Sequence, residues 1–381
     1  SGNSSGITDS GTVTVGGNLS ATTDANNGVI DLGTAAVTGT VALTTNGSGN
    51  ATVDNGTLNL DLAASNVGGD LTLTSGNSSG ITDSGTVTVG GNFSATTDAN
   101  SGVINMGTMA VDGSFTLAPN STGAVTIVND AGLNLAASTM GGTFSGTATT
   151  GNITDSGALA ITGTTTLVTS ADDATITLDT TTNAFTGALT ITTNDSSGTD
   201  ADVTIDGGTT ALIIAASTID GDLTLTSGNS SGITDSGTVT VGGNFSATTD
   251  ANSGVINMGT MAVDGSFTLA PNSTGAVTIV NDAGLNLAAS TMGGTFSGTA
   301  TTGDITDSGA LAITGAATFI TAATGSNIVL DSSGNAFSNS VEMRADGGGE
   351  AFGNITFVDS AAVDFAASAG SNGDLFINGS T

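Results

Sequence analysis

The feature that most constrains this chain is a long internal repeat. Residues 69–163 return as residues 221–315, an offset of 152 positions, and the two blocks differ only in having Asn152 in one and Asp304 in the other. The segment SGNSSGITDSGTVTVGGN occurs three times, starting at Ser1, Ser75 and Ser227. A repeat of this kind is one structural unit that packs against its neighbours. We therefore expect a single continuous repeat structure over residues 1–381, cut from a longer repeat protein.

A shorter repeat lies inside the long one. It consists of an apolar residue, a glycine-containing turn and an alternating run, as in VGGDLTLTS from Val67 and VDGSFTLAP from Val111. Its starting positions are on average about 24 residues apart. Neither a heptad nor a pair of helices has this spacing, whereas one coil of a β-helix does.

Local patterning predicts strands. Thr12–Val15 and Leu71–Thr74 alternate polar and apolar residues with a period of two, and Asp9-Ser10-Gly11 is typical of a turn. No segment has an apolar stripe of helical period, so we expect essentially no α-helix. An antiparallel sandwich would also contain such strands, but it does not require equal side chains at equivalent positions of successive units. The sequence therefore predicts an all-β parallel β-helix, or β-solenoid, of roughly 15–17 coils.

Charge and composition exclude several partners. The chain carries 33 Asp and Glu residues against a single Arg, a net charge of −32. Nucleic acid and anionic membrane surfaces both require basic residues, so we expect neither as a partner. No apolar run reaches the length of a membrane span, and we expect no membrane insertion. Cysteine is absent, which excludes disulfides and thiolate metal sites.

Catalysis is not expected either. His, Cys, Lys and Tyr, which usually supply acid–base or nucleophilic groups, are all absent. Two carboxylates would suffice for glycoside hydrolysis, but a catalytic pair should be unique. The acids instead recur with the repeat, in the ITDSG segments, at Asp9, Asp83, Asp155, Asp235 and Asp307. We expect no enzyme, no catalytic residue and no cofactor.

Calcium and ice are two possible ligands. Asp346 and Glu350 lie in a loose acidic cluster and are weak calcium candidates, but the calcium-binding nonapeptide of β-rolls is missing. Asp in a turn more often accepts hydrogen bonds from nearby backbone N–H groups. Thr-x-Thr segments, as at Thr72 and Thr224, would suit an ice-binding face, although threonine faces solvent in any β-helix.

The ITDSG segments carry a family resemblance, together with the L-D…N-A-F pattern of residues 174–193 and 326–343. The chain resembles the β-strand repeats of giant, filamentous-haemagglutinin-like bacterial surface proteins over essentially its whole length. The resemblance implies a right-handed parallel β-helix, export across a Gram-negative envelope and roles in adhesion, aggregation or biofilm matrix.

The resulting expectation is the structural shaft of an extracellular bacterial surface fibre or adhesin. The alternative is a self-assembling filament or sheath polymer of stacked rods, with end-to-end or side-by-side self-association. Other cells or surfaces are further candidate partners. Residues 326–381 diverge from the repeat and contain several Phe residues, which indicates ordinary divergence, a wider coil or a contact region.

Overall fold

The computed structural model describes residues 1–194, 200–345, 352–360, 362, 364–365 and 375–379. The chain forms two compact units, Ser1–Gly187 and Ala188–Thr381. Each unit is built from short β-strands, and no helix occurs in the described ranges. Parallel strands stack as a β-solenoid of about 16 turns, which confirms the all-β parallel solenoid predicted from the repeats.

In the first unit, the strands of sheet 1 are β1 (Ile7–Thr8), β4 (Ile30–Leu32), β7 (Ala51–Asp54), β10 (Leu71–Ser75), β13 (Phe93–Thr97), β15 (Ser114–Ala118), β17 (Leu133–Leu135), β20 (Ile153–Asp155) and β23 (Ile176–Leu178). Those of sheet 2 are β3 (Leu19–Thr22), β6 (Thr40–Thr44), β8 (Leu60–Leu62), β9 (Ser65–Val67), β11 (Ile81–Asp83), β12 (Val87–Val89), β14 (Ile104–Val111), β16 (Val125–Asn129), β19 (Phe144–Ala148) and β22 (Thr165–Thr169). Short third sheets contain β2 (Val13–Val15) with β5 (Ala35–Val37), and β18 (Ser138–Met140) with β21 (Leu159–Ile161) and β24 (Ala184–Phe185).

The second unit has the same arrangement. Its sheet 1 contains β26 (Val203–Asp206), β29 (Leu223–Ser227), β32 (Phe245–Thr249), β34 (Ser266–Ala270), β36 (Leu285–Leu287), β39 (Ile305–Asp307), β42 (Ile328–Leu330), β45 (Ile355–Asp359) and β47 (Leu375–Gly379). Its sheet 2 contains β25 (Leu189–Thr192), β27 (Leu212–Ile214), β28 (Ser217–Ile219), β30 (Ile233–Asp235), β31 (Val239–Val241), β33 (Ile256–Val263), β35 (Val277–Asn281), β38 (Phe296–Ala300), β41 (Ala317–Thr321), β44 (Ser340–Arg344) and β46 (Asp364–Phe365). Its third sheet contains β37 (Ser290–Met292), β40 (Leu311–Ile313) and β43 (Ala336–Phe337).

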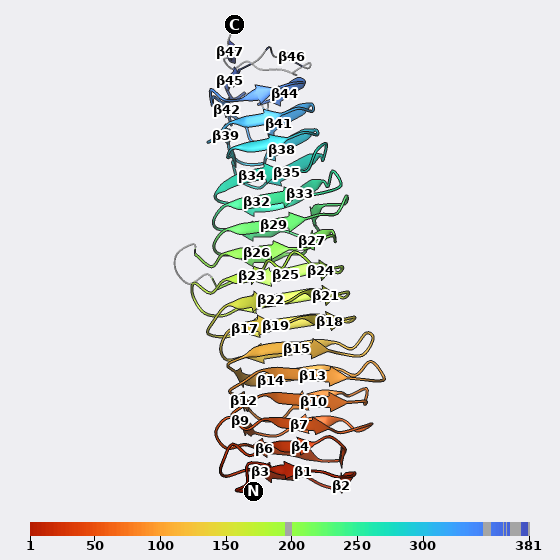
Figure 1. The fold of residues 1–381 in the computed structure, drawn as a ribbon. Helices are drawn as coiled ribbons and strands as arrows, with labels where there is room; N and C mark the ends of the chain where they lie inside the picture. Colours follow the sequence, from red (N-terminus) through yellow and green to blue (C-terminus); the bar gives the residue numbers. More distant parts are fainter. Residues whose placement is uncertain (195–199, 346–351, 361, 363, 366–374, 380–381) are drawn as a thin grey trace. The chain divides into compact units, whose positions relative to one another are not determined.

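Strands form because apolar and polar residues alternate, and stacking buries the apolar side of each strand. In β10, Leu71 and Leu73 are fully buried, whereas Thr72 between them is exposed. β10 pairs in parallel with β13 in the next coil, so that Leu71 lies level with Phe93. Figure 1 shows these coil-on-coil strands within each unit. A single coil could not cover its own apolar residues, and the ladder between coils does so.

Buried side chains form columns inside each unit. In the second unit, a column of aromatic rings passes through Phe296, Phe319, Phe337 and Phe357, with centroids 5.1, 6.1 and 5.1 Å apart. All four rings are at most 2% exposed. Phe337 and Phe357, from the divergent coils, therefore belong to the interior and extend the core of the block before them.

Glycines stack at one corner of successive coils. The backbone N–H of Gly91 donates to the carbonyl oxygen of Gly69 (3.0 Å), and that of Gly113 donates to Gly91 (3.1 Å). A Cβ on Gly91 would lie 2.7 Å from the carbonyl carbon of Gly69, closer than real Cβ atoms come. The corner requires glycine because one backbone lies directly on the next.

Candidate functional site

The recurrent ITDSG aspartates connect neighbouring coils. The carboxylate of Asp83 accepts hydrogen bonds from the backbone N–H of Gly107 (2.8 Å), and from the backbone N–H (2.7 Å) and hydroxyl (2.6 Å) of Thr108. Asp235 makes the same bonds to Gly259 and Thr260. The sequence predicted that these aspartates accept backbone hydrogen bonds nearby, and the structure places the donors one coil further on.

Asp155 and Asp307 do the same in coils of a different shape. Asp307 accepts from the backbone N–H of Asp331 (2.9 Å) and from the side-chain Nδ2 of Asn335 (2.7 Å). Asp155 has the matching contact with Nδ2 of Asn183, at 2.7 Å. The recurrent carboxylates thus hold one coil on the next.

The one position that distinguishes the blocks also links coils. Oδ1 of Asn152 accepts the backbone N–H of Thr175 at 2.9 Å. Asp304 accepts both the backbone N–H of Asn327 (2.7 Å) and its side-chain Nδ2 (3.2 Å). A carboxylate can only accept hydrogen bonds, and Asn327 above Asp304 supplies a side-chain amide donor where the equivalent residue of the first block, Thr175, has a hydroxyl.

Sequence reasoning missed a set of buried asparagines at the ends of strand ladders. Oδ1 of Asn129 accepts the backbone N–H of Val111 (2.9 Å), and its Nδ2 donates to the carbonyl oxygens of Val111 (3.0 Å) and Gly132 (2.6 Å). Asn281 holds Val263 at the same distances, 2.9 and 3.0 Å. Asn55 holds Val37 in the same way. Each side-chain amide thus supplies the donor and the acceptor that the backbone of a strand in the next coil would otherwise provide.

Buried serines act similarly where one long strand faces two short ones. The hydroxyl of Ser138 accepts the backbone N–H of Leu117 in β15 (2.9 Å) and donates to the carbonyl oxygen of Ala136 (2.9 Å). Ser65, Ser217 and Ser290 make the equivalent bonds. The corresponding sequence signal is Ala-Ala-Ser at residues 63–65, 136–138, 215–217 and 288–290.

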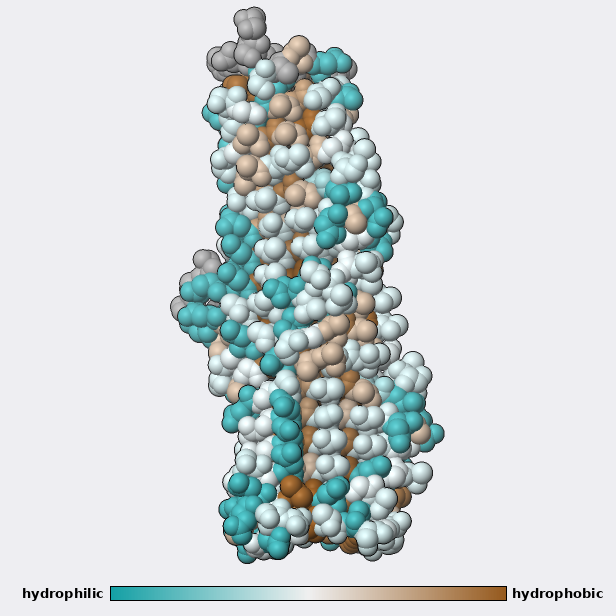
Figure 2. Space-filling view, in the orientation of Figure 1, coloured by the Kyte–Doolittle hydropathy of each residue, from teal (hydrophilic) through white to brown (hydrophobic). Residues whose placement is uncertain are grey.

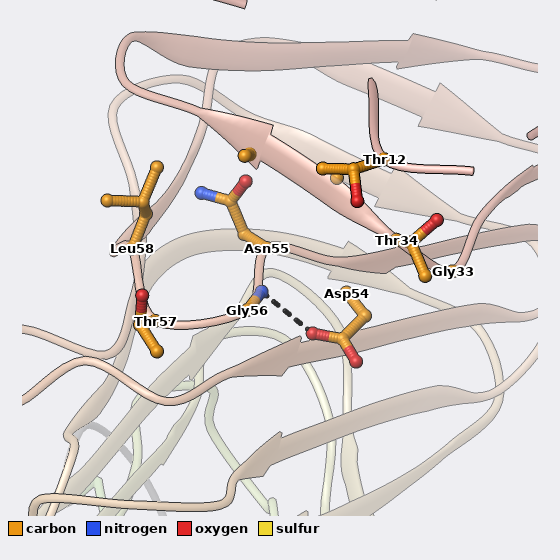
Figure 3. A pocket seen from close by; sticks show the side chains of 10 residues that line it. Thr12, Gly33, Thr34, Asp54, Asn55, Gly56, Thr57 and Leu58 are labelled. Carbon is orange, nitrogen blue, oxygen red and sulfur yellow. Dashed lines mark hydrogen bonds between the residues drawn. The ribbon is translucent and has the colours of Figure 1, made fainter. Parts of the chain in front are cut away.

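The hollows in the surface are shallow and recur with the coils. The recess in Figure 3 has a volume of about 300 Å³ and is lined by residues that include Thr12, Thr34 and Asn55. Comparable recesses of about 270 Å³ beside Asp112 and Asn134, and about 550 Å³ beside Asp264 and Asp304, lie at equivalent places in the two blocks. Each recess lies just beyond the end of a strand ladder, where the backbone of the next coil takes a different path. The recesses therefore mark changes in coil shape.

Short uncharged side chains form columns on the outside of sheet 2. Thr126, Ser145 and Thr166 are level with one another, and so are Val128, Thr147 and Val168. The second unit repeats this face with a first column Thr278, Ser297, Thr318 and a second column Val280, Thr299, Ile320. In the second unit, the two columns end in β44, where Glu342 lies level with Thr318 and Arg344 lies level with Ile320. Glu342 and Arg344 form an ion pair. In Figure 2, pale residues of intermediate hydropathy make up most of the surface in view, and hydrophilic residues gather in patches.

The Thr-x-Thr face considered for ice binding is short. Thr72 and Thr74 point outward from β10, but the residues level with Thr74 include Asp54 in β7. In the other direction along the stack, Thr74 lies level with Thr96 in β13, and Thr96 lies level with Ala118 in β15. In this part of sheet 1, paired threonines are confined to one coil.

The calcium candidates Asp346 and Glu350 lie outside the described residues. Within the ranges that the structure describes, no group of three or more His, Cys, Asp or Glu side chains could hold a metal ion. In the same ranges, no helix has the length and apolar character of a membrane span.

Comparison with known proteins identifies a repeat family. The model for "Repeats of unknown function (DUF5649)" matches residues 48–108, 122–192, 200–258 and 274–344, well over half of the chain. No curated protein and no solved structure matches the chain. The matched segments include the stacked coils, the ladder-ending asparagines 55, 129 and 281 and the serines that pair with split strands. The chain is therefore a member of the DUF5649 repeat family, with a β-solenoid fold.

Proposed function

We propose that the chain is the non-catalytic structural shaft of an extracellular bacterial surface fibre or adhesin. The supporting observation is that the buried asparagines and the ITDSG aspartates make equivalent side-chain hydrogen bonds between coils in both blocks. Oδ1 of Asn129 and of Asn281 each lie 2.9 Å from the backbone N–H of a valine, Val111 and Val263 respectively. Another block would extend the stack with contacts already present in it. The number of stacked coils determines the length of such a shaft, and its buried polar side chains serve to hold one coil on the next.

Charge is consistent with this role. A net charge of −32 keeps separate copies apart in solution, since like-charged surfaces repel. The recesses beside Thr12, Asp112 and Asp264 are open hollows that follow changes in coil shape. The resemblance to filamentous-haemagglutinin-like repeats supports the surface location.

The test is a change in copy number. Deleting residues 69–220 from the complete protein removes one full period and joins Gly68 to Gly221, which recreates the native junction of Gly68 with Gly69. We expect the shortened protein to fold, to reach the cell surface and to form a fibre shorter by the length of the deleted coils. Electron microscopy of labelled cells measures that length, and protease treatment of intact cells tests exposure.

Adhesion separates a shaft from a binding region. If the chain is a shaft, cells that carry the shortened fibre should still attach to surfaces. Only the distance that the fibre spans from the cell should change. Loss of attachment by a fibre of normal abundance, or a protein protected from protease in intact cells, would contradict the proposal.

A second candidate, side-by-side assembly into a filament or sheath, is favoured by the uncharged face of sheet 2. The side chains of Thr126, Val128, Thr147 and Val168 carry no charge in a chain that is otherwise strongly acidic. Two such faces could pack without bringing carboxylates together. Sedimentation of the purified chain and of its Thr147→Asp variant distinguishes the cases. Assembly that requires this face is abolished by the introduced carboxylate, whereas equal behaviour of the two proteins argues for the isolated shaft.

A further inference from the structure

The first coils contain three Asn-Gly dipeptides, at Asn27, Asn46 and Asn55. Asparagine before glycine can lose its amide spontaneously. The glycine backbone nitrogen attacks the side-chain carbon Cγ, a C–N bond forms, ammonia leaves, and the resulting succinimide is opened by water to aspartate or isoaspartate. Glycine favours this attack because it has no Cβ and its backbone is conformationally free. Whether each pair reacts in the folded chain depends on how nucleophile and amide are held.

Asn55 is held at both reacting groups. Its Nδ2 donates to the carbonyl oxygens of Val37 (3.0 Å) and Asn59 (2.6 Å), and the side chain is buried. The backbone N–H of Gly56, the nucleophile, donates to Oδ1 of Asp54 at 2.8 Å, the dashed contact in Figure 3. Attack would require these bonds to break together, so the fold protects this pair.

Asn27 is partly restrained. Its side chain is exposed, but the backbone N–H of Gly28 donates to the carbonyl oxygen of Ala25 at 3.2 Å, and Gly28 is buried. The nucleophile is therefore engaged in a turn, while the amide is accessible.

Asn46 differs from both. Gly47 is exposed, and its backbone N–H has no hydrogen-bond partner among the residues that the structure describes. The only hydrogen bond of the Asn46 side chain within that part of the chain is a long one, from the backbone N–H of Asn27 to Oδ1 at 3.4 Å. We infer that Asn46 is a site of spontaneous deamidation and isomerisation in the folded protein.

The duplicated blocks provide matched controls. Asn120 occupies the position of Asn46, and its Oδ1 accepts the backbone N–H of Ser101 at 3.1 Å. The residue after it is Ser121, which adopts a left-handed φ of +50° where Gly47 has +58°. Asn272 is likewise followed by Ser273, at φ +50°. The serine Cβ hinders attack, so these two asparagines are expected to persist.

The structure also explains why positions 27 and 47 differ from the blocks together. A Cβ on Gly47 would collide with Oδ1 of Asn27. In the block, Ser101 replaces Asn27, so the Oδ1 atom that would meet the Cβ is absent, and the position of Gly47 is occupied by Ser121. The double substitution Asn27→Ser with Gly47→Ser therefore reproduces a pair that the same chain already accommodates, and it is the control variant of choice.

Isomerisation at Asn46 would disturb stacking. Its backbone carbonyl accepts the N–H of Gly49 (3.1 Å), and its backbone N–H donates to the hydroxyl of Thr23 in the coil before it (3.2 Å). Isoaspartate adds a methylene group to the backbone between β6 and β7, which moves these groups out of register. We expect the first coils to open after modification, while the duplicated blocks remain intact.

The experiment is a time course on the full 381-residue chain in mildly alkaline buffer, folded and in urea. Samples are acidified and digested with pepsin, because a chain with one Arg and no Lys gives trypsin almost no cleavage sites. Mass spectrometry follows the replacement of amide by carboxyl, and electron-transfer fragmentation identifies isoaspartate. In the folded chain, we expect Asn46 to convert roughly tenfold or more faster than Asn55, Asn120 and Asn272, because its nucleophile is unrestrained.

Two comparisons make the result decisive. In urea, Asn46 and Asn55 should convert at similar rates, which shows that the fold causes the difference. The Asn27→Ser, Gly47→Ser double variant should melt at the same temperature as the parent and lose the conversion at position 46. An Asn46 that reacts in urea but stays intact in the folded chain, or an Asn55 that reacts as fast as Asn46 when folded, overturns the inference.

Discussion

The side-chain amide of Asn129 bonds both backbone groups of Val111, the residue 18 positions before it. β14 ends at Val111, and the next coil offers no strand there, so the amide supplies the missing donor and acceptor. Replacing Asn129 by alanine leaves both backbone groups of the buried Val111 unpaired and also removes a donor from the carbonyl oxygen of Gly132. For the two Val111 groups we expect a loss of roughly 2–6 kcal/mol in the free energy of unfolding, at about 1–3 kcal/mol per unsatisfied group.

Hydrogen exchange locates that effect. The amide of Val111 should exchange much faster in Asn129→Ala, and the equivalent Asn281→Ala should expose Val263 in the same way. Asn105→Ala is the control, because Asn105 is exposed on sheet 2, and it should change stability by no more than about 0.5 kcal/mol. Unchanged protection of Val111 would show that the amide is dispensable.

Ser138→Ala tests the serine that bridges a split ladder. The substitution removes the acceptor of the Leu117 backbone N–H, which lies in a buried strand. Denaturant unfolding should show a loss of about 1–3 kcal/mol, the cost of an unsatisfied buried donor. Ser145→Ala, on the outside of β19, is the matched control and should have little effect. Equal stability of the two variants would remove the assigned role from Ser138.

Gly146→Ala tests the packing of the core. A Cβ at Gly146 would lie 2.8 Å from the Phe144 ring and 2.8 Å from Cδ2 of Leu133. Overpacking of this kind costs about 1–3 kcal/mol. At Gly107 the nearest atom would be 3.9 Å away, so Gly107→Ala should be tolerated. Thermal melting of both variants checks the difference. The double variant Gly146→Ala, Phe144→Leu should recover part of the stability, because it removes one of the two obstructing groups.

Asp83→Ala tests the links between coils. The substitution removes the acceptor of three donors on Gly107 and Thr108, and we expect a loss of about 1–3 kcal/mol in thermal or denaturant unfolding. Asp235→Ala should have an equal effect. Since the two sites share no partner, the double variant should lose the sum. A double variant no weaker than either single one would contradict independent links.

Treatment with a chelator tests whether the aspartates that link coils also bind a metal ion. Their oxygens already accept hydrogen bonds from the next coil, as Asp83 and Asp307 show. We therefore expect a chelator to leave the melting temperature unchanged. A fall in melting temperature that added calcium reverses would show that a metal site contributes to stability.

The sequence was sufficient for the strands and their stacking because both depend on repetition. Leu71, Phe93 and Phe115 occupy equivalent places in successive units, and the ladder aligns them. The roles of Asn129 and Ser138 depend instead on where one coil lacks a strand that its neighbour has. That follows from the relative path of two coils, which alternation within either one does not specify. Asp83 was predictable in part. The sequence predicted that its carboxylate accepts backbone hydrogen bonds, but not that the donors belong to the next coil.

The glycine corner has a consequence for how such a chain can change. At Gly69, Gly91 and Gly113, backbone hydrogen bonds join one coil to the next. The residues after Gly69 and Gly91 add side-chain bonds of the same kind, since Asp70 accepts the backbone N–H of Asn92, and Asn92 accepts that of Ser114. A coil that has the same glycine followed by the same polar residue therefore finds the same partners in the coil beneath it. Unequal recombination between copies would then alter the length of the chain without creating an unfamiliar junction.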